Sequence, residues 1–231
     1  MNNKSIKSSD NDISSFIHQA ALDPHLDLDS LNQICDACNH FDFAGLCTNL
    51  IRLEAARKRL GNNKKTKLIA VIDFPFGYSP LSIKKTEAEW AAEYGAEELD
   101  MVPNFLKLSK GESDNFAQEV AEITSTGLPV RVILDSMRLP KESLELAIEA
   151  CIDAGARGIQ TGNGFGKAVT QDHILELHDL IKNRCEIKAA GGIKNLFQTC
   201  DLINAGATSI GTSFGTEIAK EAKPKRKPYD S

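Results

Sequence analysis

One short segment recurs three times in the sequence, and it constrains the fold more than any other feature. Residues 94–100, 154–160 and 205–211 each read as the end of a helix, a glycine and then an apolar strand. Glycine at that joint suits the left-handed backbone that often ends a helix. Three helix-to-strand joints of one form predict a repeating βα unit. The fifth residue after each glycine is Asp100, Gln160 or Gly211, so we expect these three positions to share one layer of a sheet.

Short apolar runs alternate with amphipathic stretches along the chain. The runs are rich in Val, Ile and Leu without clean alternation, which is typical of parallel strands covered on both faces. They begin near residues 16, 43, 67, 98, 130, 158, 186 and 209, a spacing of 23 to 32 residues that fits one βα unit each. Eight such units predict an α/β fold, a (β/α)8 TIM barrel in a single domain. A doubly wound open sheet is the main alternative, but its phosphate-binding glycines usually follow the first strand, whereas here they lie late.

Helical patterns fill the intervals between the runs. Residues 144–152 carry an apolar stripe with helical spacing, with Pro140 suited to the first turn and Gly155 to the position after the last. A second stripe over residues 174–181 has Thr170 as its expected N-cap. We expect the barrel to occupy residues 15–219, between a flexible segment over residues 1–14 and a flexible basic tail over residues 220–231.

Composition matters mainly for what it excludes. The chain has 27 Lys and Arg against 32 Asp and Glu, a net charge of −5, which argues against a nucleic-acid partner. No apolar run approaches the roughly 18 residues of a membrane span, and the polar N-terminus lacks a secretion signal. We therefore expect a cytoplasmic protein with no membrane partner. Its six cysteines are interpreted as buried, reduced thiols, and no second CxxC pair completes a metal site.

Function in a barrel resides at the carboxyl ends of the strands, which directs attention to a few polar residues. Asp100 ends an apolar run, where a carboxylate must be paired, hydrogen-bonded or protonated; it is a candidate general acid or base, or else it ties down a neighbouring loop. Lys188 ends another run and precedes small residues that leave room for a ligand. We interpret it as an amine nucleophile or a positive neighbour of one, or else as half of a salt bridge. Cys47 lies at the end of a third strand, and two alternatives stay open: its side chain contacts the ligand, or it only packs against neighbouring side chains.

Two glycine-rich turns, at residues 190–193 and 211–215, follow the last two expected strands. Barrels often bind phosphate in the loops after strands seven and eight, where backbone N–H groups and a helix N-terminus attract an anion. The segment over residues 161–167 would add a third wall and the positive charge of Lys167. The alternative is that all three are plain tight turns.

Five segments match a known family in order and spacing: residues 95–102, 130–135, 155–166, 187–193 and 205–213. Through them the chain resembles the deoxyribose-phosphate aldolases over roughly residues 15–219. The resemblance implies a (β/α)8 barrel and a class I aldolase with no metal or other cofactor. Such enzymes interconvert 2-deoxy-D-ribose 5-phosphate with acetaldehyde and D-glyceraldehyde 3-phosphate through a Schiff base on a lysine. By position, Asp100 matches the family's catalytic aspartate and Lys188 its second lysine.

Several residues depart from the family pattern, and the most important is Gln160, which stands where the family has its Schiff-base lysine. A carboxamide nitrogen cannot form an imine. The family's Ile-Asp-His-Thr becomes Ile-His-Gln-Ala at residues 17–20, its Thr-Ser-Thr-Gly becomes Thr-Gly-Asn-Gly at residues 161–164, and a glutamate becomes Asp135. The residues expected to contact substrate or phosphate are Cys47, Asp135, Thr161, Gly162, Lys167, Gly191, Gly192, Gly211, Thr212 and Ser213.

These residues leave three functional hypotheses. The leading one is a lyase that cleaves 2-deoxy-D-ribose 5-phosphate or a related phosphorylated sugar, slowly, with Lys188 or less plausibly Lys167 as the Schiff-base lysine. In the second, Asp100 and Lys188 form an acid/base pair for another reaction. In the third, the chain is an inactive homologue that binds a sugar phosphate or a partner protein. The expected partner is a small phosphorylated sugar or aldehyde; homo-oligomer formation stays open, and so does whether Tyr229 folds over the site.

Overall fold

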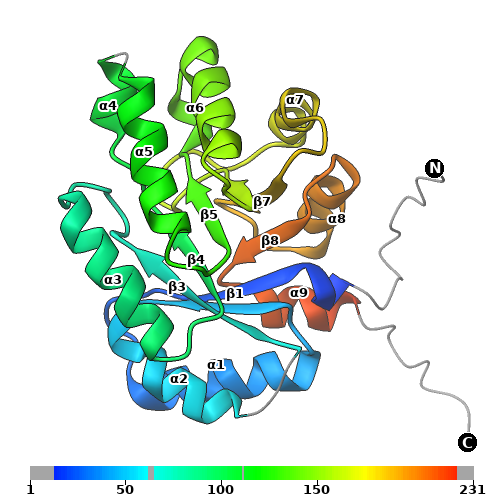
Figure 1. Ribbon diagram of the computed structural model, residues 1–231. Helices are drawn as coiled ribbons and strands as arrows, with labels where there is room; N and C mark the ends of the chain where they lie inside the picture. The colour runs from blue at the N-terminus through cyan, green and yellow to red at the C-terminus, as the bar shows by residue number, and fades with distance from the viewer. Residues whose placement is uncertain (1–12, 62–64, 111, 223–231) are drawn as a thin grey trace, which may run out of the picture.

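The computed structural model describes residues 13–61, 65–110 and 112–222, and at its centre eight parallel strands close into a barrel. Each strand pairs with the next in chain order, and β1 pairs with β8, so the predicted TIM barrel is confirmed and the open sheet is excluded. Figure 1 shows the helices arranged around this ring. The strands are β1 (Ile17–Ala21), β2 (Gly45–Thr48), β3 (Lys67–Ile72), β4 (Glu98–Met101), β5 (Val130–Ile133), β6 (Gly158–Gln160), β7 (Glu186–Ala190) and β8 (Ser209–Thr212).

A helix follows every strand, and two follow β4. Short 3₁₀ turns precede β1 and open the connections after β2 and β5, at Ile13–Phe16, Leu50–Arg52 and Ser136–Arg138. The helices are α1 (Leu28–Phe41), α2 (Leu53–Leu60), α3 (Leu81–Glu93), α4 (Phe105–Ser109), α5 (Ser113–Thr124), α6 (Lys141–Asp153), α7 (Gln171–Ile181), α8 (Leu196–Asn204) and α9 (Gly215–Ala222).

The local signals read from the sequence account for the joints between these elements. The three repeated glycines all have the left-handed backbone that was expected, with φ of 85° at Gly95, 77° at Gly155 and 117° at Gly206. Thr170 caps α7, since its side chain accepts a hydrogen bond from the backbone N–H of His173. The apolar stripe of α6 is buried as predicted.

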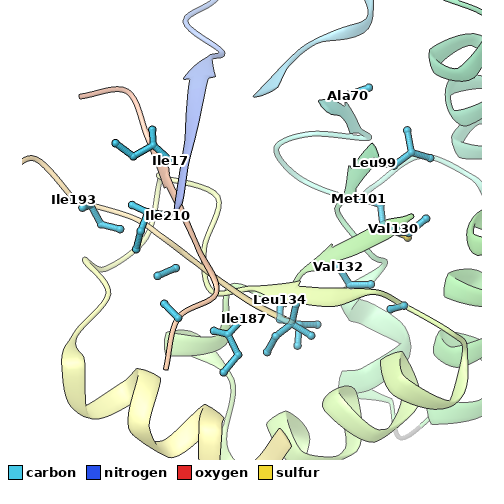
Figure 2. Packing of buried hydrophobic residues seen from close by; sticks show 14 of the residues in the cluster. Ile17, Ala70, Leu99, Met101, Val130, Val132, Leu134, Ile187, Ile193 and Ile210 are labelled. Carbon is cyan, nitrogen blue, oxygen red and sulfur yellow. The ribbon is translucent and has the colours of Figure 1, made fainter. Parts of the chain in front are cut away.

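The main hydrophobic core lies outside the barrel, between the strands and the helices. Alternate strand residues such as Leu99, Val132 and Ile187 point to this layer and are buried there. Figure 2 shows part of it. The opposite faces of the strands point into the barrel, where apolar and charged side chains lie together. Ile69 and Val71 form a small apolar cluster with Cys47, while several other interior positions carry charged residues.

The expected domain boundaries fall within ordered elements. Ile13 is buried in the first 3₁₀ turn, so structure begins before residue 15, and α9 continues to Ala222, past residue 219. The rest of both expected flexible segments, with Tyr229, lies outside the described residues. All six cysteines are free thiols; five are buried and Cys185 is half-buried. Among the residues that the structure describes, no helix combines the length and apolar character of a membrane span.

Candidate active site

A cavity of about 750 Å³ opens at the carboxyl ends of the strands. Its floor includes four side chains that can take part in polar contacts, each from a different strand: His18 from β1, Cys47 from β2, Gln160 from β6 and Lys188 from β7; the apolar Val71 of β3 lies among them. The loops after β1, β3, β6, β7 and β8 form its walls. The mouth is partly aromatic, because the ring centroids of Phe74 and Phe165 lie 6.3 Å apart across it.

Lys188 contacts Asp100 directly, and both are almost completely buried. Asp100 lies beneath the cavity floor and does not line it. Its other carboxylate oxygen accepts a hydrogen bond of 2.9 Å from Nε of Arg131. Burial alone would raise the pKa of Asp100, but the charges of Lys188 and Arg131 outweigh burial and hold that pKa well below its ordinary value. Asp100 is therefore a paired carboxylate near pH 7, which is one of the states that its place in an apolar run allowed.

Arg131 continues this chain of charges toward the other end of the barrel. Its Nη2 lies 2.6 Å from Glu98, whose other oxygen lies 3.3 Å from the half-exposed Arg157. Arg157 in turn lies 2.9 Å from Glu186. Alternating charges thus run from the cavity floor to the surface, and every buried member has a partner of opposite sign, which a buried charge requires.

Gln160 is paired in register with Lys188, so the two side chains lie next to each other on adjacent strands. Its amide nitrogen donates a hydrogen bond of 2.7 Å to the carbonyl of Gly162. Its amide oxygen is buried without a hydrogen-bond partner. Gln160, which lines the cavity, thus has a free acceptor oxygen but no nucleophilic nitrogen.

The two other floor residues are both electrically neutral near pH 7. Burial, with help from the charges of Lys188 and Arg131, lowers the pKa of His18 well below 6.5. Burial also raises the pKa of the Cys47 thiol to about 12, and this thiol donates a hydrogen bond of 3.5 Å to Asp100. Cys47 is therefore not a nucleophile but a small group that packs against the catalytic candidates.

The glycine-rich turns after β7 and β8 meet at one side of the cavity, as the sequence predicted. Gly191, Gly192, Gly211, Thr212 and Ser213 all line it. The Thr212 hydroxyl donates to the carbonyl of Ile193 at 2.7 Å and accepts from the N–H of Phe214, so it holds the two turns together. Ser213 is exposed in the cavity wall, just before the N-terminus of α9. This arrangement suits an anion.

The loop after β6 contributes less than its sequence indicated. Gly162 lines the cavity, but Thr161 is buried below it and exchanges hydrogen bonds with the backbone of Ala190. Lys167 is exposed and does not line the cavity. Asp135 also lies outside the lining, in an ion pair of 3.2 Å with Arg138. Of the residues expected to contact ligand, these three are the ones that the structure places elsewhere.

Two buried charges were not expected from the sequence: Arg131, which with Lys188 holds Asp100 in its charged state, and Glu98, which pairs with Arg131. A signal was present: each is a charged residue inside a short apolar strand, and a charge there must point into a polar interior or find a partner. His18 was noted only as a departure from the family pattern. The structure places it on the cavity floor.

Comparisons with known proteins agree with this geometry. No protein-family model matches the chain. A deoxyribose-phosphate aldolase from Microcystis aeruginosa is 35% identical over 219 residues, covering 94% of this chain and 97% of that protein. One from Trichormus variabilis is 37% identical over 208 residues, covering 90% and 92% of the two chains.

Solved structures give the same result. A structure described as "QR15, an Aldolase" superposes with a TM-score of 0.87 at 33% identity, covering 91% of this chain and 95% of that one. A tetrameric deoxyribose-phosphate aldolase from Aeropyrum pernix superposes with a TM-score of 0.82 at 28% identity, covering 91% and 90%. Identity of this extent over nearly the whole chain, on the same closed barrel, shows that the chain belongs to the deoxyribose-phosphate aldolase family.

Proposed function

We propose that this chain is a carbon–carbon lyase that cleaves 2-deoxy-D-ribose 5-phosphate, or a closely related phosphorylated sugar, with Lys188 as the Schiff-base lysine. The observation that carries this proposal is the position of Lys188, which rises from β7 on the cavity floor beside the anion-binding turns. Among the described residues, Lys188 and Lys194 are the lysines that line the cavity. Lys194 is exposed at the rim, with its ammonium 5.6 Å from the centroid of the Phe214 ring, so Lys188 is the better-placed amine.

The reaction follows from ordinary imine chemistry. The amine of Lys188 attacks the aldehyde carbon of the open-chain sugar, and loss of water gives an iminium. Cleavage of the bond between C2 and C3 sends its electron pair into the iminium, while the hydroxyl on C3 loses its proton and becomes the aldehyde of glyceraldehyde 3-phosphate. The enamine left on Lys188 takes up a proton at carbon and is hydrolysed to acetaldehyde. The turns at Gly191–Gly192 and Thr212–Ser213 would hold the phosphate throughout.

The same geometry predicts a low rate. The Lys188 ammonium must lose a proton before it can attack, and its contacting carboxylate, Asp100, is held ionised by two cations. Asp100 is therefore a poor acceptor for that proton. Gln160, in the position next to Lys188, contributes no second amine.

The first experiment is a direct one. Incubation with acetaldehyde and borohydride should leave a reduced two-carbon adduct on Lys188, located by peptide mass spectrometry. Purified protein should also release glyceraldehyde 3-phosphate from 2-deoxy-D-ribose 5-phosphate. Lys188→Met should lose both signals, and the rim variant Lys194→Met should keep the adduct. A protein with no adduct and no cleavage would remove the lyase proposal.

A second function has its own support in the carboxamide of Gln160, whose unpartnered oxygen suits binding rather than covalent chemistry. In that case the chain binds a sugar phosphate without turnover. Thermal stabilisation by 2-deoxy-D-ribose 5-phosphate or inorganic phosphate, in a protein that forms no Lys188 adduct, would support this function. Homo-oligomer formation and location in the cytoplasm stay predictions.

A further inference from the structure

His18 occupies a slot on the cavity floor that two glycines leave open. It is the second residue of β1, and its register partners on either side are Gly45 in β2 and Gly211 in β8. A Cβ atom on Gly45 would lie 3.1 Å from Cδ2 of the imidazole, so a larger residue there would press on the ring. The imidazole is thus placed by the absence of neighbouring side chains on both sides.

The side chain of Lys188 lies over the second of these glycines, Gly211. A Cβ atom on Gly211 would lie 3.0 Å from Cε of Lys188, so the stem of the lysine passes directly over this glycine. Gly211 is also the β8 partner of His18. His18 and Lys188 both line the cavity, and the charge of Lys188 is one of the causes of the lowered pKa of His18. A two-carbon group carried on Nζ of Lys188 would lie in the cavity that the imidazole also lines.

The imidazole is free to act on such a group. His18 is only 7% exposed, and its Nδ1 is buried without a hydrogen-bond partner. The charged groups around it are Lys188, Arg131 and Arg157, which favour the neutral ring, and Asp100, which opposes them. An unpartnered buried nitrogen costs free energy, and such atoms often mark a functional role.

Asp100, beneath the floor, and the floor residues Cys47 and Gln160 are unsuited to accept a proton. Both carboxylate oxygens of Asp100 are engaged, one by Lys188 and one by Arg131, and its side chain is fully buried. The thiol of Cys47 is neutral and already donates to Asp100. Gln160 does not titrate. Within the described part of the chain, His18 is thus the one neutral base on the floor.

We infer that His18 is a further catalytic residue, the general base that moves the proton on the carbon next to the imine of Lys188. This inference rests on the proposed lyase function. In the step, the imidazole takes a proton from the α-carbon of the iminium. The C–H electron pair becomes the C=C bond of the enamine, and the C=N pair returns to nitrogen as a lone pair. In the cleavage direction the imidazolium returns the proton to carbon.

The test separates imine formation from proton transfer. Acetaldehyde is incubated with the protein in D₂O, and exchange of its methyl protons for deuterium is followed by NMR; borohydride trapping measures the Lys188 adduct in parallel. His18→Asn should keep the adduct within about twofold and slow exchange by about a hundredfold or more, the usual effect of losing a general base. The matched control is His40→Asn, the same substitution at an exposed histidine of α1 that does not line the cavity, which should behave as wild type.

Each outcome decides the question. An adduct without exchange in His18→Asn supports the inference. Unchanged exchange, or loss of the adduct together with exchange, overturns it and leaves the lyase proposal standing. No adduct in the wild type overturns both. If His18→Asn does not fold, His18→Gln and the wild-type pH profile decide. Exchange per unit of adduct should hold level near about pH 6.5 and fall only well below it, because burial lowers the pKa at which the imidazole takes up a proton. A profile that stays flat over the whole pH range in which the protein is folded would contradict the role.

Discussion

Single residues in this barrel depart from the usual rule that a barrel interior is filled by branched apolar side chains. Lys188, Asp100, Arg131 and Glu98 occupy interior positions, and all are nearly inaccessible. Their burial is tolerated because each has a partner of opposite charge. The consequence is that Lys188, the amine of the proposed lyase reaction, lies in contact with a carboxylate.

Gln160→Lys tests whether the other residues of the site can support the aldolase reaction when a lysine stands at position 160. The new ammonium would lie next to Lys188 on the neighbouring strand, where mutual repulsion favours loss of a proton from one of the pair. We expect cleavage of 2-deoxy-D-ribose 5-phosphate to rise by about tenfold or more, the order of an activated amine over an unactivated one. The assay is release of glyceraldehyde 3-phosphate.

A matched variant makes this result interpretable. Gln160→Met has a similar length but no amine, and it should not gain activity. If Gln160→Lys folds and is no faster than the wild type, the rest of the site is not competent for the family's reaction.

At the scale of elements, the cavity depends on how the loops after β6 and β7 fit together. The N–H of Val169 donates to the carbonyl of Gly191 at 3.1 Å, which fixes one loop on the other. Gly192 has φ of 72°, and a Cβ atom there would lie 2.7 Å from Cβ of Ala168. The turn at Gly191–Gly192, which we propose to bind phosphate, therefore requires glycine at residue 192 for two reasons: its backbone conformation and the close approach of the neighbouring loop.

Gly192→Ala should weaken phosphate binding. The backbone conformation costs about 1–2 kcal/mol for a residue with a Cβ, and the contact with Ala168 forces the two loops apart. We expect the affinity for inorganic phosphate, measured by calorimetry, to fall by about tenfold or more.

Gly127→Ala is the control for this prediction. Gly127 has φ of 93°, but a Cβ atom there would have no neighbour within 4 Å. This variant should lose stability on thermal unfolding through the backbone strain alone, and it should bind phosphate as the wild type does. Equal phosphate affinity in both variants would show that the turn at Gly192 does not form the anion site.

On the scale of the whole molecule, the apolar core outside the barrel holds the fold together, while the polar interior makes that fold sensitive to acid. His18 has a lowered pKa in the folded state, so the unfolded chain binds a proton first as pH falls below about 6.5. Asp100 also has a lowered folded pKa, so its stabilisation is complete above about pH 4 and is lost below that value. Both groups act in the same direction.

The free energy of unfolding should therefore fall in two stages as pH decreases. Each group contributes up to about 1.4 kcal/mol per pH unit within its own range, first His18 below about pH 6.5 and then Asp100 below about pH 4. Urea unfolding followed by circular dichroism at pH 7.5, 6, 5, 4 and 3 measures this dependence. His18→Asn should remove the first stage and keep the second; a wild-type stability that does not change between pH 7.5 and 5 would contradict the assignment to His18.

The sequence by itself determined the fold class and most of the cavity. Periodic apolar runs and the glycine joints at residues 95, 155 and 206 specify the βα units locally, because helix ends and strand cores are set by nearby residues. Once the strands are located, their carboxyl ends are known. Gln160, Lys188 and the turns at Gly191 and Gly211 can then be predicted to lie at the cavity. No additional sequence motif is needed to predict that the barrel closes, because eight equivalent βα units pair in a ring in which no strand has an unpaired edge.

Only the tertiary structure decided which charges meet. Asp100, Arg131 and Lys188 come from three different strands, and their pairing depends on the stagger of the strands around the ring, which no short segment encodes. For the same reason Asp135 and Lys167 could not be separated from the true lining residues by their position after a strand. The place of His18 between two glycines on neighbouring strands is likewise a contact of residues far apart in the chain, and it exists because the barrel brings β1 against both β2 and β8.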